Sequence, residues 1–115
     1  MDETHVTLTA MGDAHVIGLP ADVGAGTEDA LLPIVDEIFA ASPRLIVVDF
    51  GRVESTNSAG VGLLFDLLRR SRQHHVPVVL ASIRAQPKLV VERVQLTRYA
   101  DVFATVEEAI ASVRS

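Results

Sequence analysis

The sequence predicts an α/β domain with a mixed, mostly parallel central sheet, an N-terminal hairpin and about four helices. Three observations lead to this prediction. Two short apolar runs, 44–50 and 76–82, are rich in valine and are typical of strands buried on both faces. Segments with helical spacing of apolar residues follow them, so strand and helix alternate from residue 14 onward. The length of 115 residues suits one domain, which we expect to span 1–115.

The first two strands are predicted to form a hairpin. Residues 4–9 alternate apolar and polar side chains, and residues 14–19 are apolar around one glycine. Met11, Gly12 and Asp13 supply the turn between them. The hairpin, together with the last helix, offers an edge at which two copies could pair as a homodimer.

A first helix is predicted after a loop at 20–26. Thr27 can cap this helix, and apolar residues recur at helical spacing as far as Ala41. Pro33 lies inside the segment, where a proline removes a backbone hydrogen bond. The helix is therefore expected to kink at Pro33 or to begin late, nearer Leu32.

The loop after the strand at 44–50 leads into an amphipathic helix that runs from Ser58 to about His74. Ser58 is predicted as its N-cap, and capping alone would explain a serine at this place. Gly60 and Gly62 thin the first turn and let another surface approach closely. Ligand and switch sites of open α/β sheets gather at such loops, at the carboxyl ends of strands.

The last third of the chain adds two helices and a strand. A helix is predicted at 86–96, with Leu89 on its inner face. Residues 101–105 predict a short strand. Thr105 and Glu108 have the spacing of a capping box at the start of a final helix.

The composition argues against several classes of function. The chain contains no cysteine, which removes disulfides, cysteine nucleophiles and thiolate metal sites. The apolar runs are far shorter than the ~20 residues of a membrane span, and the acidic N-terminus lacks a signal-peptide pattern. We therefore expect a cytoplasmic protein without a membrane partner. The net charge of −5 opposes direct binding of nucleic acid.

The sequence contains no constellation typical of catalysis, metal binding or cofactor binding. His74 and His75 are adjacent, so on a helix they point to different faces and cannot chelate one ion. The glycines at 60 and 62 lack the Gly-Lys-Ser/Thr ending of a nucleotide-phosphate loop. No Gly-x-Ser-x-Gly elbow surrounds Ser58. We therefore expect no enzymatic activity, no metal and no cofactor.

Three stretches resemble the STAS domain, the module of sulfate transporters and anti-sigma factor antagonists: VDFGRVESTNSAGVGLLFDLLRRSR, VPVVLAS and LTRYADVFATVEEAI. In the family, an apolar strand leads to Asp-Ser-Ser-Gly or Asp-Ser-Thr-Gly, then to Leu-Gly and a leucine-rich helix. Residues 57–64 occupy that place here. The resemblance covers nearly the whole chain and implies a single STAS domain with the α/β fold.

The resemblance also implies a regulatory protein. In bacterial anti-sigma factor antagonists, the unphosphorylated protein captures an anti-sigma factor that is itself a serine kinase, and so frees a sigma factor for transcription. The kinase phosphorylates the first serine or threonine of the motif, whose place Ser58 holds, and phosphorylation ends the capture. Ser55 and Thr56 are less favoured acceptors. The partner surface that the resemblance implies comprises Glu54, Ser55, Thr56, Asn57, Ser58, Ala59, Gly60, Val61 and Gly62, together with 24–27.

The motif departs from the family's pattern at three places. Asn57 replaces the acidic residue, and Ala59 replaces the second hydroxyl residue. Ser55 and Thr56 stand where the connector is usually apolar. Asn57 keeps one acceptor of an aspartate but not its charge. These departures leave a second interpretation open, a STAS scaffold or assembly subunit of a regulatory or transport complex that is not phosphorylated.

Overall fold

A five-stranded sheet forms the centre of the protein, whose computed structural model describes residues 6–113. Its strands are β1 (Thr7–Met11), β2 (Ala14–Gly18), β4 (Leu45–Asp49), β6 (Val78–Ala81) and β7 (Val102–Phe103), and they lie in the order β1-β2-β4-β6-β7. β1 is antiparallel to β2, and the other neighbours are parallel. The predicted mixed, mostly parallel sheet with a leading hairpin is confirmed.

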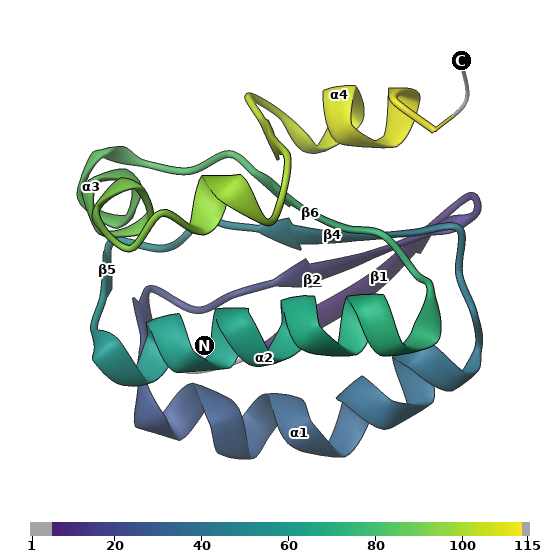
Figure 1. Cartoon of the computed structure of the whole chain (residues 1–115), viewed down its shortest axis with the longest axis horizontal. Coiled ribbons are helices and arrows are strands. Elements are labelled where there is room, and N and C mark those ends of the chain that lie inside the picture. Colours follow the sequence, from purple (N-terminus) through teal and green to yellow (C-terminus); the bar gives the residue numbers. More distant parts are fainter. Residues whose placement is uncertain (1–5, 114–115) are drawn as a thin grey trace.

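Helices cover both faces of this sheet (Figure 1). They are α1 (Ala25–Ala40), α2 (Ser58–His74), α3 (Ala85–Arg93) and α4 (Val106–Ala111), with a short 3₁₀ turn, η1 (Leu96–Arg98). α1 and α2 lie against one face, α4 lies over the other, and α3 lies at the end toward which the β2 and β4 arrows point. Within residues 6–113, no helix is both long and apolar enough to cross a lipid bilayer.

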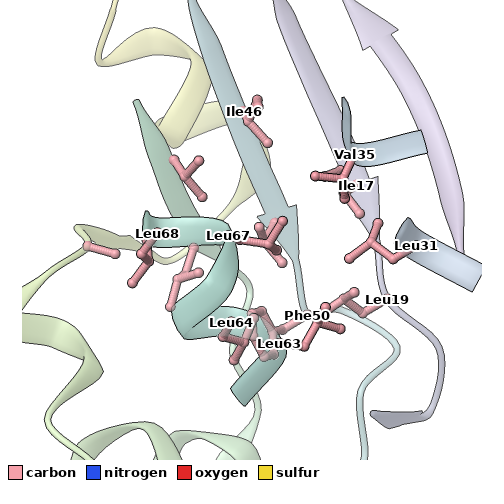
Figure 2. Packing of buried hydrophobic residues seen from close by; sticks show 14 of the residues in the cluster. Ile17, Leu19, Leu31, Val35, Ile46, Phe50, Leu63, Leu64, Leu67 and Leu68 are labelled. Carbon is pink, nitrogen blue, oxygen red and sulfur yellow. The ribbon is translucent and has the colours of Figure 1, made fainter. Parts of the chain in front are cut away.

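The larger hydrophobic core lies between the sheet and the helices α1 and α2. Figure 2 shows side chains converging from the helices and the sheet, among them Leu31 of α1, Leu67 of α2 and Ile46 of β4. Each of these side chains is at most 1% exposed. Because burial of one such side chain contributes ~1.5–3 kcal/mol, this layer holds α2, and with it Ser58, in place.

The strand β4 contributes to both layers of the core. Ile46 and Val48 belong to the cluster under α1 and α2. Leu45 and Val47 point to the other face and pack with Ile110 of α4. Since consecutive strand residues point to opposite faces, an uninterrupted apolar run is the pattern that a central strand requires.

An ion-pair network joins α1 to α2. Arg70 of α2 donates to Asp66 on its own helix, with its Nε 3.0 Å from Oδ2, and to Asp36 on α1. The hydrogen bond to Asp66 raises the pKa of Arg70 above its usual value. The network supports the parallel arrangement of the two helices beside the sheet.

The hairpin is tighter than the sequence predicted. β1 extends to Met11, which pairs with Ala14, so Gly12 and Asp13 alone form the turn. Gly12 has φ = 63°, in the left-handed region that favours glycine. Residues 4–5 of the predicted strand lie outside the described residues. β1 forms one edge of the sheet, and pairing of that edge in a homodimer stays a prediction.

The helix α1 begins at Ala25, so both a start at Thr27 and a late start near Leu32 are wrong. Gly24 is the N-cap, and its N–H donates to Oγ1 of Thr27 at 3.1 Å. Thr27 therefore supports the cap from inside the first turn. α1 continues past Pro33 because its buried face, anchored in the core, compensates for the one hydrogen bond that a proline removes.

The third helix differs from its prediction in length and in the face that it buries. Leu89 was expected to point inward, but its side chain is 62% exposed. Pro87 and Val91 are buried instead. Gln95 adopts a left-handed backbone (φ = 61°) that ends the helical register, so Leu96 reaches the core from η1.

Candidate functional site

Two short strands that the sequence did not predict form the framework of the site. β3 (Asp22–Val23) pairs in parallel with β5 (Ser55–Thr56), so that Asp22 faces Ser55 and Val23 faces Thr56. Both segments were expected to be loops. Their pairing places the start of α1 beside the start of α2 at one end of the sheet (Figure 1).

The paired segments line an open pocket of about 300 Å³. Its lining comprises Asp22, Val23, Gly24, Gly26, Thr27, Ser55, Thr56 and Asn57. The pocket therefore takes residues from both parts of the predicted partner surface, 24–27 and 54–62. In this respect the structure brings together residues that are about thirty positions apart in the sequence.

Asn57, and not Ser58, is the N-cap of α2. Its Oδ1 accepts hydrogen bonds from the N–H groups of Ala59 at 3.0 Å and Gly60 at 3.1 Å. Its backbone is extended (φ = −128°), as an N-cap requires, whereas Ser58 is already the first helical residue. The predicted capping role of Ser58 is therefore wrong. Asn57 keeps the capping function of an acidic residue at this place without its charge.

The three hydroxyl residues of the motif have different surroundings. Ser55 donates from Oγ to Oδ1 of Asp22 at 2.5 Å. Thr56 is 9% exposed and donates from Oγ1 to the carbonyl of Val23 at 3.3 Å. Ser58 is exposed, and within the described part of the chain its hydroxyl has no hydrogen-bond partner. Of the three, Ser58 is the residue that is fully exposed and whose hydroxyl is not held by the fold.

The other residues of the predicted surface surround Ser58. Glu54 and Ala59 are exposed, and Val61 is half-buried. The N–H of Glu54 donates to the carbonyl of Ala21 at 2.7 Å, which ties the β5 segment to the chain before β3. The predicted surface therefore combines exposed side chains with backbone that the two-stranded β3–β5 sheet holds in place.

The two glycines of the motif have different structural roles. A Cβ atom at Gly60 would lie 2.5 Å from the carbonyl oxygen of Val23 and would also collide with Oγ1 of Thr56. The missing side chain at Gly60 thus allows α2 to start directly against β3 and β5. A Cβ atom at Gly62 would meet no heavy atom within 4 Å among the described residues.

Sequence reasoning missed two polar residues of the site. Asp22 accepts the hydroxyl of Ser55, and Gln86 of α3 accepts the N–H of Thr56 through Oε1 at 3.3 Å. Asp22 follows the strand β2, and a polar residue near the carboxyl end of a strand is the signal that could have identified it. Gln86 belongs to a separate helix, and no local pattern links it to the motif.

Two exposed carboxylates lie at the β3–β5 pair. Asp22 accepts the hydroxyl of Ser55, and Glu54 directly precedes β5. No lysine or arginine occurs in residues 19–43 or 53–68, which supply α1 and the first part of α2. A partner that covers the β3–β5 pair therefore meets the carboxylates of Asp22 and Glu54.

Replacing Asn57 with alanine is expected to lower the free energy of unfolding by about 1 kcal/mol, because two amide groups lose their acceptor. Asn57→Asp keeps the acceptor and is expected to be neutral or slightly stabilising near the helix N-terminus. Urea denaturation measures the free energy of unfolding of both variants. The control is Ser58→Ala, which leaves the cap intact; a larger loss for Ser58→Ala than for Asn57→Ala would contradict the assignment of the cap.

Residues 5–109 match the model of the STAS domain family. A search of curated proteins found no match.

Several solved structures share the fold. A putative anti-sigma factor antagonist from Thermotoga maritima superimposes with a TM-score of 0.81 at 20% identity, covering 96% of this chain and 95% of that one. The Bacillus anti-sigma factor antagonist SpoIIAA in its unphosphorylated form gives 0.75 at 24% identity, covering 95% and 96%. A sulfate transporter family protein from Wolinella succinogenes gives 0.80 at 14% identity, covering 92% and 88%.

Proposed function

The chain belongs to the STAS domain family, and we propose that it is an anti-sigma factor antagonist that phosphorylation of Ser58 switches off. In its unphosphorylated form it binds an anti-sigma factor with serine kinase activity in the cytoplasm, and so regulates sigma-factor-dependent transcription. The kinase transfers the γ-phosphoryl group of ATP to Oγ of Ser58, the hydroxyl proton is lost and ADP leaves. The chain itself acts as a binding protein and not as an enzyme.

The accessibility of the Ser58 hydroxyl is the observation that supports this proposal most directly. A phosphoryl acceptor has to enter the active site of another protein, so it must be exposed and not held by its own fold. Ser58 meets both conditions, whereas Ser55 and Thr56 donate to Asp22 and Val23. The likeness to SpoIIAA, which is described in an unphosphorylated form, supports the same interpretation.

A phosphate on Ser58 is compatible with the fold but not with a closely fitting partner. The N-terminus of a helix favours an anion through its dipole and its N–H groups. The modification adds about −1.5 to −2 charges to a face that already contains Asp22 and Glu54. A partner that fits this face would have to desolvate the dianion, so binding is lost while the domain stays folded.

The test begins with immobilised wild-type, Ser58→Ala and Ser58→Asp proteins exposed to lysate of the source organism. Mass spectrometry is expected to identify a serine kinase that wild type and Ser58→Ala retain and Ser58→Asp does not. This kinase, purified and supplied with ATP, is then expected to phosphorylate wild type and Ser55→Ala but not Ser58→Ala. Retention of the same proteins by all three variants would instead support a scaffold.

The scaffold is the second candidate function, and the motif itself favours it. Asn57 retains the capping of α2 but lacks the charge of the family's acidic residue. Ala59 removes the second hydroxyl. The motif thus keeps the residue that caps α2 but not the charge and the second hydroxyl. The fold is shared with a sulfate transporter family protein. A STAS subunit that assembles a regulatory or transport complex without phosphorylation would need no more than this.

A further inference from the structure

We propose that the free edge of β1, residues 6–10, pairs with the same edge of a second copy of this chain. The two strands run antiparallel about a two-fold axis at Leu8, and the two sheets become one continuous sheet. We call residues 6–10 the β1 edge. None of them belongs to the predicted partner surface, 24–27 and 54–62. The inference is therefore independent of the kinase and adds a second interaction surface.

The hairpin register leaves backbone groups of β1 pointing away from the sheet. Met11 and Ala14 flank the two-residue turn, so they form a hydrogen-bonded pair, and such pairs alternate along an antiparallel ladder. Leu8 and Ala10 therefore direct their N–H and C=O groups outward. Within residues 6–113, these groups have no hydrogen-bond partner. The β1 edge is thus a free ladder that one more strand can complete.

The strand β1 lacks the features by which edge strands usually avoid such pairing. Charged side chains, proline, a bulge or short length commonly protect an edge. Residues 6–11 contain no charged residue, proline or glycine, although 22% of the chain is charged. β1 pairs with β2 without a bulge, and all five of its residues are exposed. The opposite edge of the sheet, β7, is only two residues long.

The side chains of β1 fit a second copy of the same strand. Leu8 shares a face with its cross-strand neighbour Ile17, which lies in the core under α1 and α2, yet Leu8 is 46% exposed. A two-fold axis at Leu8 places it against the partner's Leu8. On the other face, Thr7 lies opposite the partner's Thr9. Because the strand has no charge, the axis brings no like charges together, although the chain has a net charge of −5.

The backbone ladder agrees with this axis. Residues whose backbone groups point outward must meet each other, so Leu8 exchanges hydrogen bonds with the partner's Leu8, and Ala10 does so with the partner's Val6. Both copies use the same residues, as in an isologous interface. The paired segment is about 17 Å long and buries less than the ~800 Å² per partner of a standard interface. We therefore expect a dimer that dissociates on dilution.

Sedimentation velocity of the full chain, between about 10 µM and about 1 mM, tests the pairing. The fraction of dimer is expected to rise with concentration. Leu8→Lys places two like charges at the axis and is expected to raise the Kd of the dimer about tenfold or more. The matched control is Leu89→Lys, the same change at an exposed leucine of α3, which should dimerise like wild type. Circular dichroism measures the folding of both variants.

A second variant removes a hydrogen bond of the dimer without adding a charge. Ala10→Pro deletes an N–H that points away from β2, at a place where an edge strand tolerates proline. It is expected to weaken the dimer as Leu8→Lys does and to keep the hairpin. A dimer that Leu8→Lys and Ala10→Pro form as well as wild type would show that another surface holds the two copies, and would overturn the proposal.

Cysteine cross-linking locates the axis, because the chain has no cysteine of its own. The cysteine in Leu8→Cys would lie opposite its own copy, with Cα atoms about 5.5 Å apart, a separation that a disulfide spans. Mild oxidation is expected to link Leu8→Cys into a dimer and to leave Leu89→Cys largely monomeric. Preferential linking of Thr9→Cys would overturn the axis at Leu8. A wild-type protein that stays monomeric at about 1 mM would overturn the pairing itself, and the proposed function, which depends on Ser58, would be unaffected.

Discussion

Replacing Ser58 with aspartate is expected to weaken binding of the serine kinase by about 30-fold to several thousand-fold. Burying a charge without a partner in an interface costs ~2–5 kcal/mol, and the exposed carboxylates of Asp22 and Glu54 already lie at the neighbouring β3–β5 pair. The fold should be unaffected. Ser58 is exposed, its hydroxyl makes no hydrogen bond within the described residues, and it is the first residue of a helix, whose start favours an anion.

Titration calorimetry at one salt concentration measures this loss, and two controls isolate its cause. Ser58→Asn has nearly the shape of the aspartate without its charge, so it is expected to bind close to wild type. Asn57→Asp adds the same charge one residue earlier, at the cap, where the family usually has an acidic residue. Equal losses for Asn57→Asp and Ser58→Asp would show that the overall charge of the face, and not the site, controls binding.

Much of the fold follows from local patterns. The apolar run at 44–50 predicts β4 because a strand buried on both faces has no polar side to alternate. The helix from Ser58 to His74 matches its predicted bounds, since an amphipathic period sustained over several turns allows few other structures. The position of Ser58 at the start of that helix is a consequence of the same pattern.

The cap of α2 could not be predicted because it depends on a contact between distant segments. Asparagine and serine are both favoured N-caps, so the motif alone does not choose between them. The pairing of β3 with β5 determines which of the two residues is the N-cap. The N–H of Asn57 donates to the carbonyl of Val23 at 3.4 Å, which keeps the backbone extended through Asn57. The helix therefore begins at Ser58, one residue earlier than a cap at Ser58 would allow.

The pairing of β3 with β5 had no sequence signal of its own. Each strand is two residues long, too short for alternation to show, and the partners lie 33 residues apart. Asp22 was consequently left in a loop, although it holds the hydroxyl of Ser55. The choice among the three hydroxyls depends on these contacts, so the sequence could rank Ser58 first only through the resemblance.

Gly60→Ala is expected to lower the free energy of unfolding by about 2–3 kcal/mol or more, although alanine is the better helix former. The new Cβ atom would lie 2.5 Å from the carbonyl oxygen of Val23, a backbone atom that cannot rotate away. The start of α2 would have to move off β3, and the bond from Thr56 to that carbonyl would weaken. Because Ser58 moves with this turn, kinase binding should fall as well. Urea denaturation and calorimetry measure the two effects.

Gly62→Ala is the matched control for Gly60→Ala, because it makes the same chemical change two residues later on the same helix. It is expected to raise the free energy of unfolding by about 0.5–1 kcal/mol. Equal stability of the two variants would contradict the close contact between α2 and β3. Changes of opposite sign in the free energy of unfolding would show that packing inside the domain requires a glycine at position 60.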